Sequence, residues 1–233
     1  MKVTFIHHSG FFVNGEHACF LFDYWTGPLP KPLESPLFIF VSHGHRDHFT
    51  PDIFDYGRQW KNVHWVLSYD IDPECVPSDL MPYVTFAAPD NKYSVSSGNT
   101  VISFSTLRST DLGNAYLIYT GDKTLYHAGD LHLWIWRESQ EDDKVMQAAF
   151  EKEIDKLRGV TIDAAFLTLD PRQGRDAFLG LDYIARLADI KWIYPMHCWQ
   201  NFNIINKLLA DPCSEPYRDK ICPIRKDGYT DEI

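Results

Sequence analysis

The stretch from Leu37 to His48 limits most strongly what this chain can fold into. Its first five residues, Leu37 to Val41, are all apolar and lie between Pro36 and Ser42. A short, continuously apolar run of this kind is typical of a strand buried on both faces, as in a parallel or mixed sheet. We therefore expect a sheet with this strand in its interior.

Potential metal ligands follow the end of this predicted strand. They are His43, His45, Asp47 and His48, and Gly44 lets the backbone turn tightly between the first two. In an extended segment side chains alternate, so His43, His45 and Asp47 would project to one side and His48 to the other. One loop can thus serve two neighbouring metal positions. Imidazole and carboxylate ligands suit zinc, iron and manganese alike, so these ligand types leave the metal open.

The same residues carry a family resemblance. The run His43-Gly44-His45-Arg46-Asp47-His48 resembles the His-x-His-x-Asp-His signature of the metallo-β-lactamase superfamily. The resemblance extends from an early strand ending in Asp23 to a late strand ending in His197. It implies an αβ/βα four-layer sandwich, an α+β fold in which two mixed sheets are flanked by helices. It also implies a metal position formed by Asp47, His48 and His197, a second formed by His43 and His45, and Asp130 as the bridge.

One motif of the family is missing. Where the family has a third-motif histidine, this chain has the run Arg108-Ser109-Thr110-Asp111-Leu112-Gly113, and no histidine occurs between His64 and His127. Asp111 is the nearby carboxylate that can replace it, so we expect the second metal position to be the weaker one. The resulting cofactor prediction is one or two divalent ions per chain, with zinc first and manganese or iron as alternatives.

Two residues before the histidine loop are further candidates. Asp23 matches the family's first-motif aspartate, which implies that it holds the histidine loop rather than binding metal, since such carboxylates fix imidazole orientation. A turn-capping role is the alternative for Asp23. His8 is a candidate for the rim of the pocket, or a polar turn residue.

Further candidates follow the later strands. Leu131-His132-Leu133-Trp134-Ile135-Trp136 comes directly after Asp130, and we expect one tryptophan in the core and the other in the pocket wall, since two buried indole N–H groups would need partners. His132 is a pocket acid or base, a substitute ligand or a structural residue. Arg172, Arg108 and His132 are candidates to hold an anionic substrate.

The rest of the pattern predicts a mixed set of elements. Residues 2–6 and 17–22 are predicted to form a hairpin through Asn14-Gly15. Ser139 to Leu157 is the clearest helix, because Ser139 can cap it and Gly159 can end it. The tail from Asp211 is predicted to be irregular. Other strands are predicted at 63–67, 84–86, 93–95, 101–107, 115–119, 124–127, 164–169 and 192–195, helices at 176–187 and 203–209, and turns at Ser97-Gly98 and Thr120-Gly121-Asp122.

Composition narrows the class of partner. The chain has 233 residues and a formal net charge of −10 without a basic block, which argues against nucleic acid as a partner. Its five scattered cysteines favour a reducing compartment, and no apolar run reaches membrane-spanning length. We expect a single domain over residues 1–233 in a cytoplasmic protein that acts on a small molecule, with no membrane partner. The oligomeric state is left open.

The resemblance implies a metal-dependent hydrolase that uses activated water on a small ester, lactone or phosphoester, with Asp47 orienting the water or moving its proton. Two alternatives stay open. One is a mononuclear-iron redox member resembling the sulfur dioxygenases of the superfamily. The other is a non-catalytic binding or sensing protein on the same scaffold.

Overall fold

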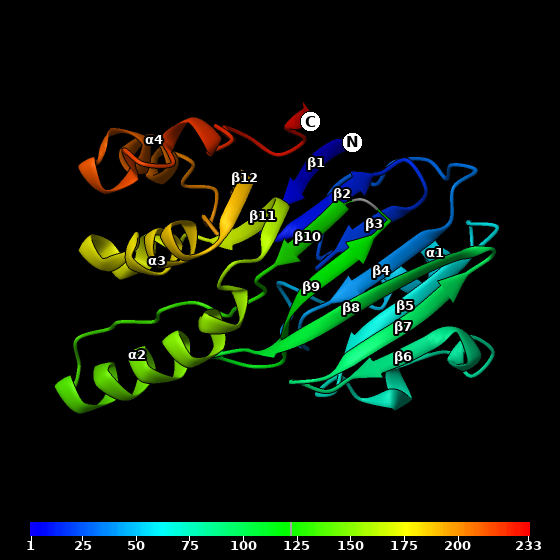
Figure 1. Ribbon diagram of the computed structural model, residues 1–233. Coiled ribbons are helices and arrows are strands. Elements are labelled where there is room, and N and C mark those ends of the chain that lie inside the picture. Colours follow the sequence, from blue (N-terminus) through cyan, green and yellow to red (C-terminus); the bar gives the residue numbers. More distant parts are fainter. Residues whose placement is uncertain (122) are drawn as a thin grey trace.

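Two mixed β-sheets form the centre of the molecule (Figure 1). The computed structural model describes residues 1–121 and 123–233; Asp122, at the end of the turn predicted at Thr120-Gly121-Asp122, lies outside the described residues. The first sheet has seven strands in the order β13-β1-β2-β3-β4-β5-β6, and the second has six in the order β12-β11-β10-β9-β8-β7. Neighbouring strands from β3 through β6 in the first sheet, and from β10 through β12 in the second, pair in parallel. The other pairs are antiparallel.

Strand β4 (Leu37–Val41) is the predicted buried strand, and every residue in it is buried. Its side chains alternate between two apolar clusters. Phe38 and Phe40 face the second sheet, whereas Leu37, Ile39 and Val41 pack on the outer side with helix α1 (Asp52–Gly57). The apolar run therefore reflects packing on both faces.

Helices α2 (Gln140–Ile154), α3 (Leu179–Leu187) and α4 (Asn203–Ala210) cover the outer face of the second sheet. Phe150 and Ile154 from α2, Leu181 from α3 and Leu208 from α4 join the same core cluster as that sheet. With α1 on the opposite side, the layers are helix, sheet, sheet, helix, as the family resemblance implies. Among the described residues, no helix combines the length and apolarity needed to cross a membrane.

The predicted N-terminal hairpin is wrong in its pairing. Strand β1 (Lys2–His7) pairs with an additional strand, β2 (Gly10–Asn14), and the Asn14-Gly15 turn connects β2 to β3 (Cys19–Phe22). The chain therefore turns sharply at His8 and Ser9, two residues that the single predicted hairpin left in a loop. The tail is also less irregular than predicted, because Thr230–Glu232 (β13) pairs with β1. Figure 1 shows the two chain ends side by side there.

The other elements agree with the predicted types. Ser139 caps α2 by accepting a hydrogen bond from the Asp142 amide. Helix α3 begins later than predicted, after a 3₁₀ segment at Pro171–Asp176. The remaining strands are β5 (Val63–Ser68), β6 (Val84–Ala87), β7 (Lys92–Ser97), β8 (Thr100–Arg108), β9 (Asn114–Thr120), β10 (Lys123–His127), β11 (Thr161–Thr168) and β12 (Asp189–Met196).

Candidate metal centre

The ends of strands from both sheets bring two clusters of potential ligands together. The segment after β4 supplies both clusters, the segment after β10 supplies Asp130, and the segment after β12 supplies His197. The turn between β1 and β2 adds His8, and the loop between β8 and β9 adds Asp111. The first cluster contains His8, Asp47, His48 and His197, and the second contains His43, His45, Asp111 and Asp130.

The first cluster is the more buried one. His8, His48 and His197 are buried and Asp47 is half-buried. Asp47 Oδ2 lies 3.2 Å from His8 Nε2, 3.9 Å from His197 Nε2 and 4.0 Å from His48 Nε2. Donors 2.0–2.1 Å from a tetrahedral zinc ion stand about 3.4 Å apart, so this spacing suits one ion.

The second cluster opens to solvent. His43 is buried, but the side chains of His45 and Asp111 are 50% and 47% exposed. His43 Nε2 lies 3.0 Å from His45 Nδ1, and His45 Nδ1 lies 3.7 Å from Asp111 Oδ2. Asp111 therefore lies beside the two histidines of this cluster, and it makes this ligand set richer in oxygen.

Asp130 belongs to the second cluster and also reaches the first. Its Oδ1 is 3.3 Å from His48 Nε2 and 3.5 Å from His197 Nε2 in the first cluster. Its Oδ2 is 3.7 Å from His43 Nε2 in the second. One carboxylate with an oxygen toward each cluster has the arrangement that a bridging ligand needs.

Several buried polar atoms of the centre have no hydrogen-bond partner in the described part of the chain. They are the Nε2 atoms of His8, His48 and His197 and the Oδ1 of Asp130. The three nitrogen atoms lie 3.2–3.5 Å from carboxylate oxygens of the centre without forming a hydrogen bond. A buried polar group without a hydrogen bond costs about 1–3 kcal/mol, so a ligand that these atoms share would be favourable. A divalent cation accepts lone pairs from all of them, and the residues present therefore fit a metal.

Hydrogen bonds orient the imidazoles toward the centre. Asp23 Oδ2 lies 2.7 Å from His48 Nδ1 and accepts from the Ser42 hydroxyl at 2.6 Å. That hydroxyl lies 2.9 Å from His43 Nδ1, so its oxygen can accept a hydrogen bond from the imidazole N–H. Partners of this kind hold the proton on Nδ1 and leave the Nε2 lone pair for metal. Asp23 thus lies behind the histidine loop.

Asp170 does the same for His197. Its Oδ2 lies 3.0 Å from His197 Nδ1 and accepts from the Trp199 indole N–H at 3.2 Å. The carboxylate also accepts from the Arg172 backbone N–H and guanidinium. Asp170 is fully buried.

The backbone is strained at several of these residues. Asp23, His8, His197 and Trp199 have φ values of 39°, 54°, 62° and 47°. Such left-handed conformations are unfavourable for residues other than glycine, and they persist where the surrounding structure over-determines them. The turns that place these side chains are therefore held by their neighbours.

Burial and neighbouring charges shift the pKa values of the histidines in opposite directions in the metal-free protein. Burial lowers the pKa of His8 and of His43 to about 4, so both are neutral and available as ligands at neutral pH. Burial opposes a proton on His48 too, but Asp130 and Asp23 outweigh it and raise the pKa of His48 to about 9. A metal that binds His48 must displace this proton.

The pKa values of the carboxyl groups also shift in opposite directions. Burial favours the neutral form of Asp130, yet His48 and His197 hold its pKa below the usual range. Asp47 also has a lowered pKa, because His8 and His48 overcome the effect of burial. The pKa of Asp111 is instead raised by burial and by Asp130, and a nearby cation would lower it again.

The alternation argument for the histidine loop is wrong. It placed Asp47 with His43 and His45, whereas the structure places Asp47 with His48. The segment after β4 is a series of turns rather than extended backbone, so a two-residue period does not apply to it. His8, expected only at the rim or in a polar turn, lies inside the first cluster.

A cavity of about 360 Å³ opens onto both clusters. Trp134, Trp136, Trp199, Met146, Thr110 and Arg172 line it together with residues of the two clusters. As expected, one of the two tryptophans is buried and the other is exposed at the pocket: Trp134 is buried and donates its indole N–H to the Asp130 carbonyl oxygen, whereas Trp136 is exposed. Trp134 also contributes to the cavity lining. His132 lies outside its lining, fully buried with Nε2 2.7 Å from Gln173 Oε1. Arg108 pairs with Asp90 instead.

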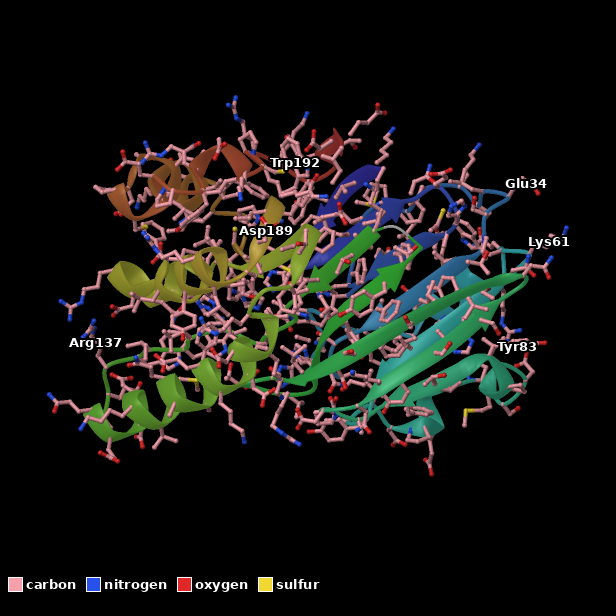
Figure 2. The ribbon with its side chains drawn as sticks, viewed as in Figure 1. Glu34, Lys61, Tyr83, Arg137, Asp189 and Trp192 are labelled. Carbon is pink, nitrogen blue, oxygen red and sulfur yellow. The ribbon has the colours of Figure 1, made fainter. Side chains whose placement is uncertain are left out.

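Sequence reasoning missed Asp170 and Trp199 as parts of the site. Both follow predicted strands, and that position at a strand end was the available signal. A larger cavity of about 630 Å³ is lined by Lys61, Tyr83 and His64, among others. Figure 2 shows Lys61 and Tyr83 at the opposite end of the molecule from Arg137 and α2. Of the described residues that line this cavity, His64 is the one histidine, and none belongs to either ligand cluster.

The layered fold and the paired histidine and aspartate clusters define a metal-binding αβ/βα sandwich. Residues 2–146, more than half of the chain, match the model of the beta-lactamase superfamily domain, and the chain belongs to that family.

Two relatives share sequence with the chain. A UPF0173 metal-dependent hydrolase from Desulforamulus reducens is 26% identical over 147 residues, which cover 58% of this chain and 64% of that protein. A UPF0173 metal-dependent hydrolase from Heliobacterium modesticaldum is 25% identical over 231 residues, which cover 90% of this chain and 87% of that protein.

Solved structures share the fold. Igni18, a metallo hydrolase from Ignicoccus hospitalis, aligns with a TM-score of 0.64 and 18% identity over 100% of this chain and 98% of its own. The metallo-beta-lactamase fold protein YhfI from Bacillus subtilis aligns with a TM-score of 0.57 and 18% identity over 99% of both chains.

Proposed function

We propose that the chain is a metal-dependent hydrolase that activates water for attack on a small ester, lactone or phosphoester. The observation that carries this proposal is the set of unpaired buried atoms, the Nε2 of His8, His48 and His197 and the Oδ1 of Asp130, that converge on one point beside an open cavity. The names of the two sequence relatives, both metal-dependent hydrolases, support the same reaction class.

His8, Asp47, His48 and His197 would hold one ion, and His43, His45 and Asp111 a second, with Asp130 between them. A divalent ion supplies Lewis acidity, which lowers the pKa of water and polarises a carbonyl or phosphoryl oxygen. Zinc suits the histidine-rich first cluster, and the oxygen-richer second cluster also suits manganese or iron.

Asp47 is the best-placed residue to handle the proton of the attacking water. It is half-buried, lines the cavity and keeps a lowered pKa, so its carboxylate is charged at neutral pH. A charged carboxylate can accept a hydrogen bond from water and fix the direction of attack. Trp134 lines the same cavity as Asp47, and its indole N–H donates to the Asp130 carbonyl oxygen.

Two measurements test the proposal. Elemental analysis of protein purified without chelators should give about two zinc or manganese ions per chain, and such protein should hydrolyse members of an aryl ester, lactone and bis-aryl phosphodiester panel. His197→Ala should abolish turnover, and Asp55→Ala, at an exposed position on α1, should leave it unchanged. One iron per chain with oxygen consumption would replace hydrolysis by the redox alternative, and a protein that never binds metal would leave a binding scaffold.

A further inference from the structure

The mouth of the cavity exposes aromatic surface that the fold does not bury. The Trp136 and Trp199 side chains are 47% and 41% exposed, although indoles are usually covered in a folded chain. Trp136 stacks in parallel on Trp134, with ring centroids 5.9 Å apart. Trp199 is fixed by the hydrogen bond from its indole N–H to Asp170. These rings therefore present rigid apolar faces to whatever enters.

Arg172 is the cation at this mouth. Among the described residues that line the cavity, it is the one lysine or arginine. Its Nε and Nη2 pair with Asp170, and its guanidinium lies 4.8 Å from the centre of the Trp199 ring. Within the described part of the chain Nη1 makes no hydrogen bond, so one end of a held guanidinium stays available.

This arrangement favours an anion over a neutral group. A guanidinium fixed by pairing and stacking loses little conformational freedom when it binds, and its remaining N–H groups can donate to a carboxylate. In the metal-free cavity the carboxylates of Asp47, Asp111 and Asp130 would repel an anion, so Arg172 is the side chain with which a carboxylate can pair. A volume of about 360 Å³ falls among sites for small ligands.

We propose that the cavity selects substrates with a flat apolar group and a carboxylate, the flat group packing on the exposed faces of Trp136 and Trp199 and the carboxylate pairing with Arg172. This substrate class rests on the proposed hydrolase function, but the binding site does not require turnover.

Calorimetric titration of the zinc-loaded protein with 2-naphthoate and 2-naphthamide tests the proposal. Naphthoate should bind about tenfold more tightly, as expected for one charge-assisted pair. Arg172→Gln should remove this preference, and Arg172→Lys should keep part of it. The matched control is Arg175→Gln, an exposed arginine of the same segment that does not line the cavity. It should keep the full preference. Metal content, measured in each variant, shows whether the centre is intact.

If Arg172→Gln keeps the preference for naphthoate at full metal content, the proposal is overturned, because the metal would then be the group that binds the carboxylate. Equal binding of the two compounds by the wild type would overturn it as well. Trp136→Ala should weaken the binding of both compounds to the same extent. Unchanged affinity would show that the flat group does not pack on Trp136. If naphthoate is preferred but no carboxynaphthyl ester is hydrolysed, the anion site is supported and the hydrolase function fails.

Discussion

We expect Asp111 to determine how strongly the second cluster holds a metal. It stands 3.7 Å from His45 Nδ1 on the open side of the centre, where the family resemblance implies a histidine. Asp111→Ala should weaken the second ion by at least about tenfold and leave close to one ion per chain after dialysis against a weak chelator. Asp111→His should tighten it. Elemental analysis checks both, with Asp52→Ala as an exposed acidic control. Two ions retained in Asp111→Ala would show that Asp111 is no ligand.

We expect His132 to contribute to the pH dependence of stability in the metal-free protein. Burial lowers the pKa of His132 from 6.5 to about 4. Between these values the unfolded chain binds a proton that the folded chain rejects, so stability falls as the pH drops, by at most about 1.4 kcal/mol per unit for one group. His132→Gln should therefore flatten the dependence of the free energy of unfolding on pH from 6.5 to 4.

Urea denaturation in the presence of a chelator measures this slope. His17→Gln, at an exposed histidine, should keep the wild-type slope. The slope should not vanish in His132→Gln, because burial lowers the pKa of His8, His43 and His64 in the same direction. An unchanged slope would mean that His132 accepts a proton in the folded state.

At the residue scale, sequence reasoning finds the side chains that stand close in the chain. His43, His45, Asp47 and His48 form one short run, so their spacing alone indicates a metal site. Residues such as His8 and Asp170 are isolated in the sequence, and only the turns after β1 and β11 bring them to the centre. Their partners lie in other elements, and a single sequence does not show that contact.

At the element scale, Gly113 permits β9 to approach the end of β4. It has a φ of 74°, and a Cβ there would lie 2.0 Å from the Ser42 carbonyl oxygen and 2.6 Å from His43 Cβ. Gly113→Ala should destabilise the fold by about 2–4 kcal/mol and displace His43, so it should also weaken metal binding.

Gly159 supplies a matched control for this prediction. It has the same φ of 74°, but a Cβ there would meet nothing within 4 Å. Gly159→Ala should cost only the backbone strain, about 1 kcal/mol, and leave metal binding unchanged. Urea denaturation and metal titration compare the two variants. Equal losses would show that strain alone, and not the approach to β4, requires glycine at position 113.

Elements with strong local patterns were predictable, and elements that depend on distant pairing were not. Strand β4 is a pure apolar run and α2 has a capping serine, so both were predicted in type and place. Strand β2 was missed because the Asn14-Gly15 turn was assigned to the wrong preceding strand. Strand β13 has three residues and exists through its pairing with β1, so no local signal marks it.

At the scale of the whole molecule, the candidate ligands join the two sheets. His8, His43 and His48 extend from strands of the first sheet, and Asp130 and His197 from strands of the second. The family resemblance implied this layered fold, but the positions of the ligands depend on how one sheet packs on the other. Bound metal would therefore add a connection between the sheets at the edge where acidic side chains gather.

Metal should consequently stabilise the whole fold, not only the loops. Free zinc at 100 times its dissociation constant adds about 2.7 kcal/mol to the free energy of unfolding, which raises the melting temperature by roughly 5–10 °C in a chain of this size. Differential scanning calorimetry with zinc and with a chelator measures this shift. His197→Ala removes a ligand of the second sheet from the buried cluster and should lose most of it, whereas Asp111→Ala, at the open cluster, should lose a smaller part. A melting temperature that chelator leaves unchanged would mean that packing alone holds the sheets together, and that the unpaired nitrogens of the centre are compensated by something other than metal.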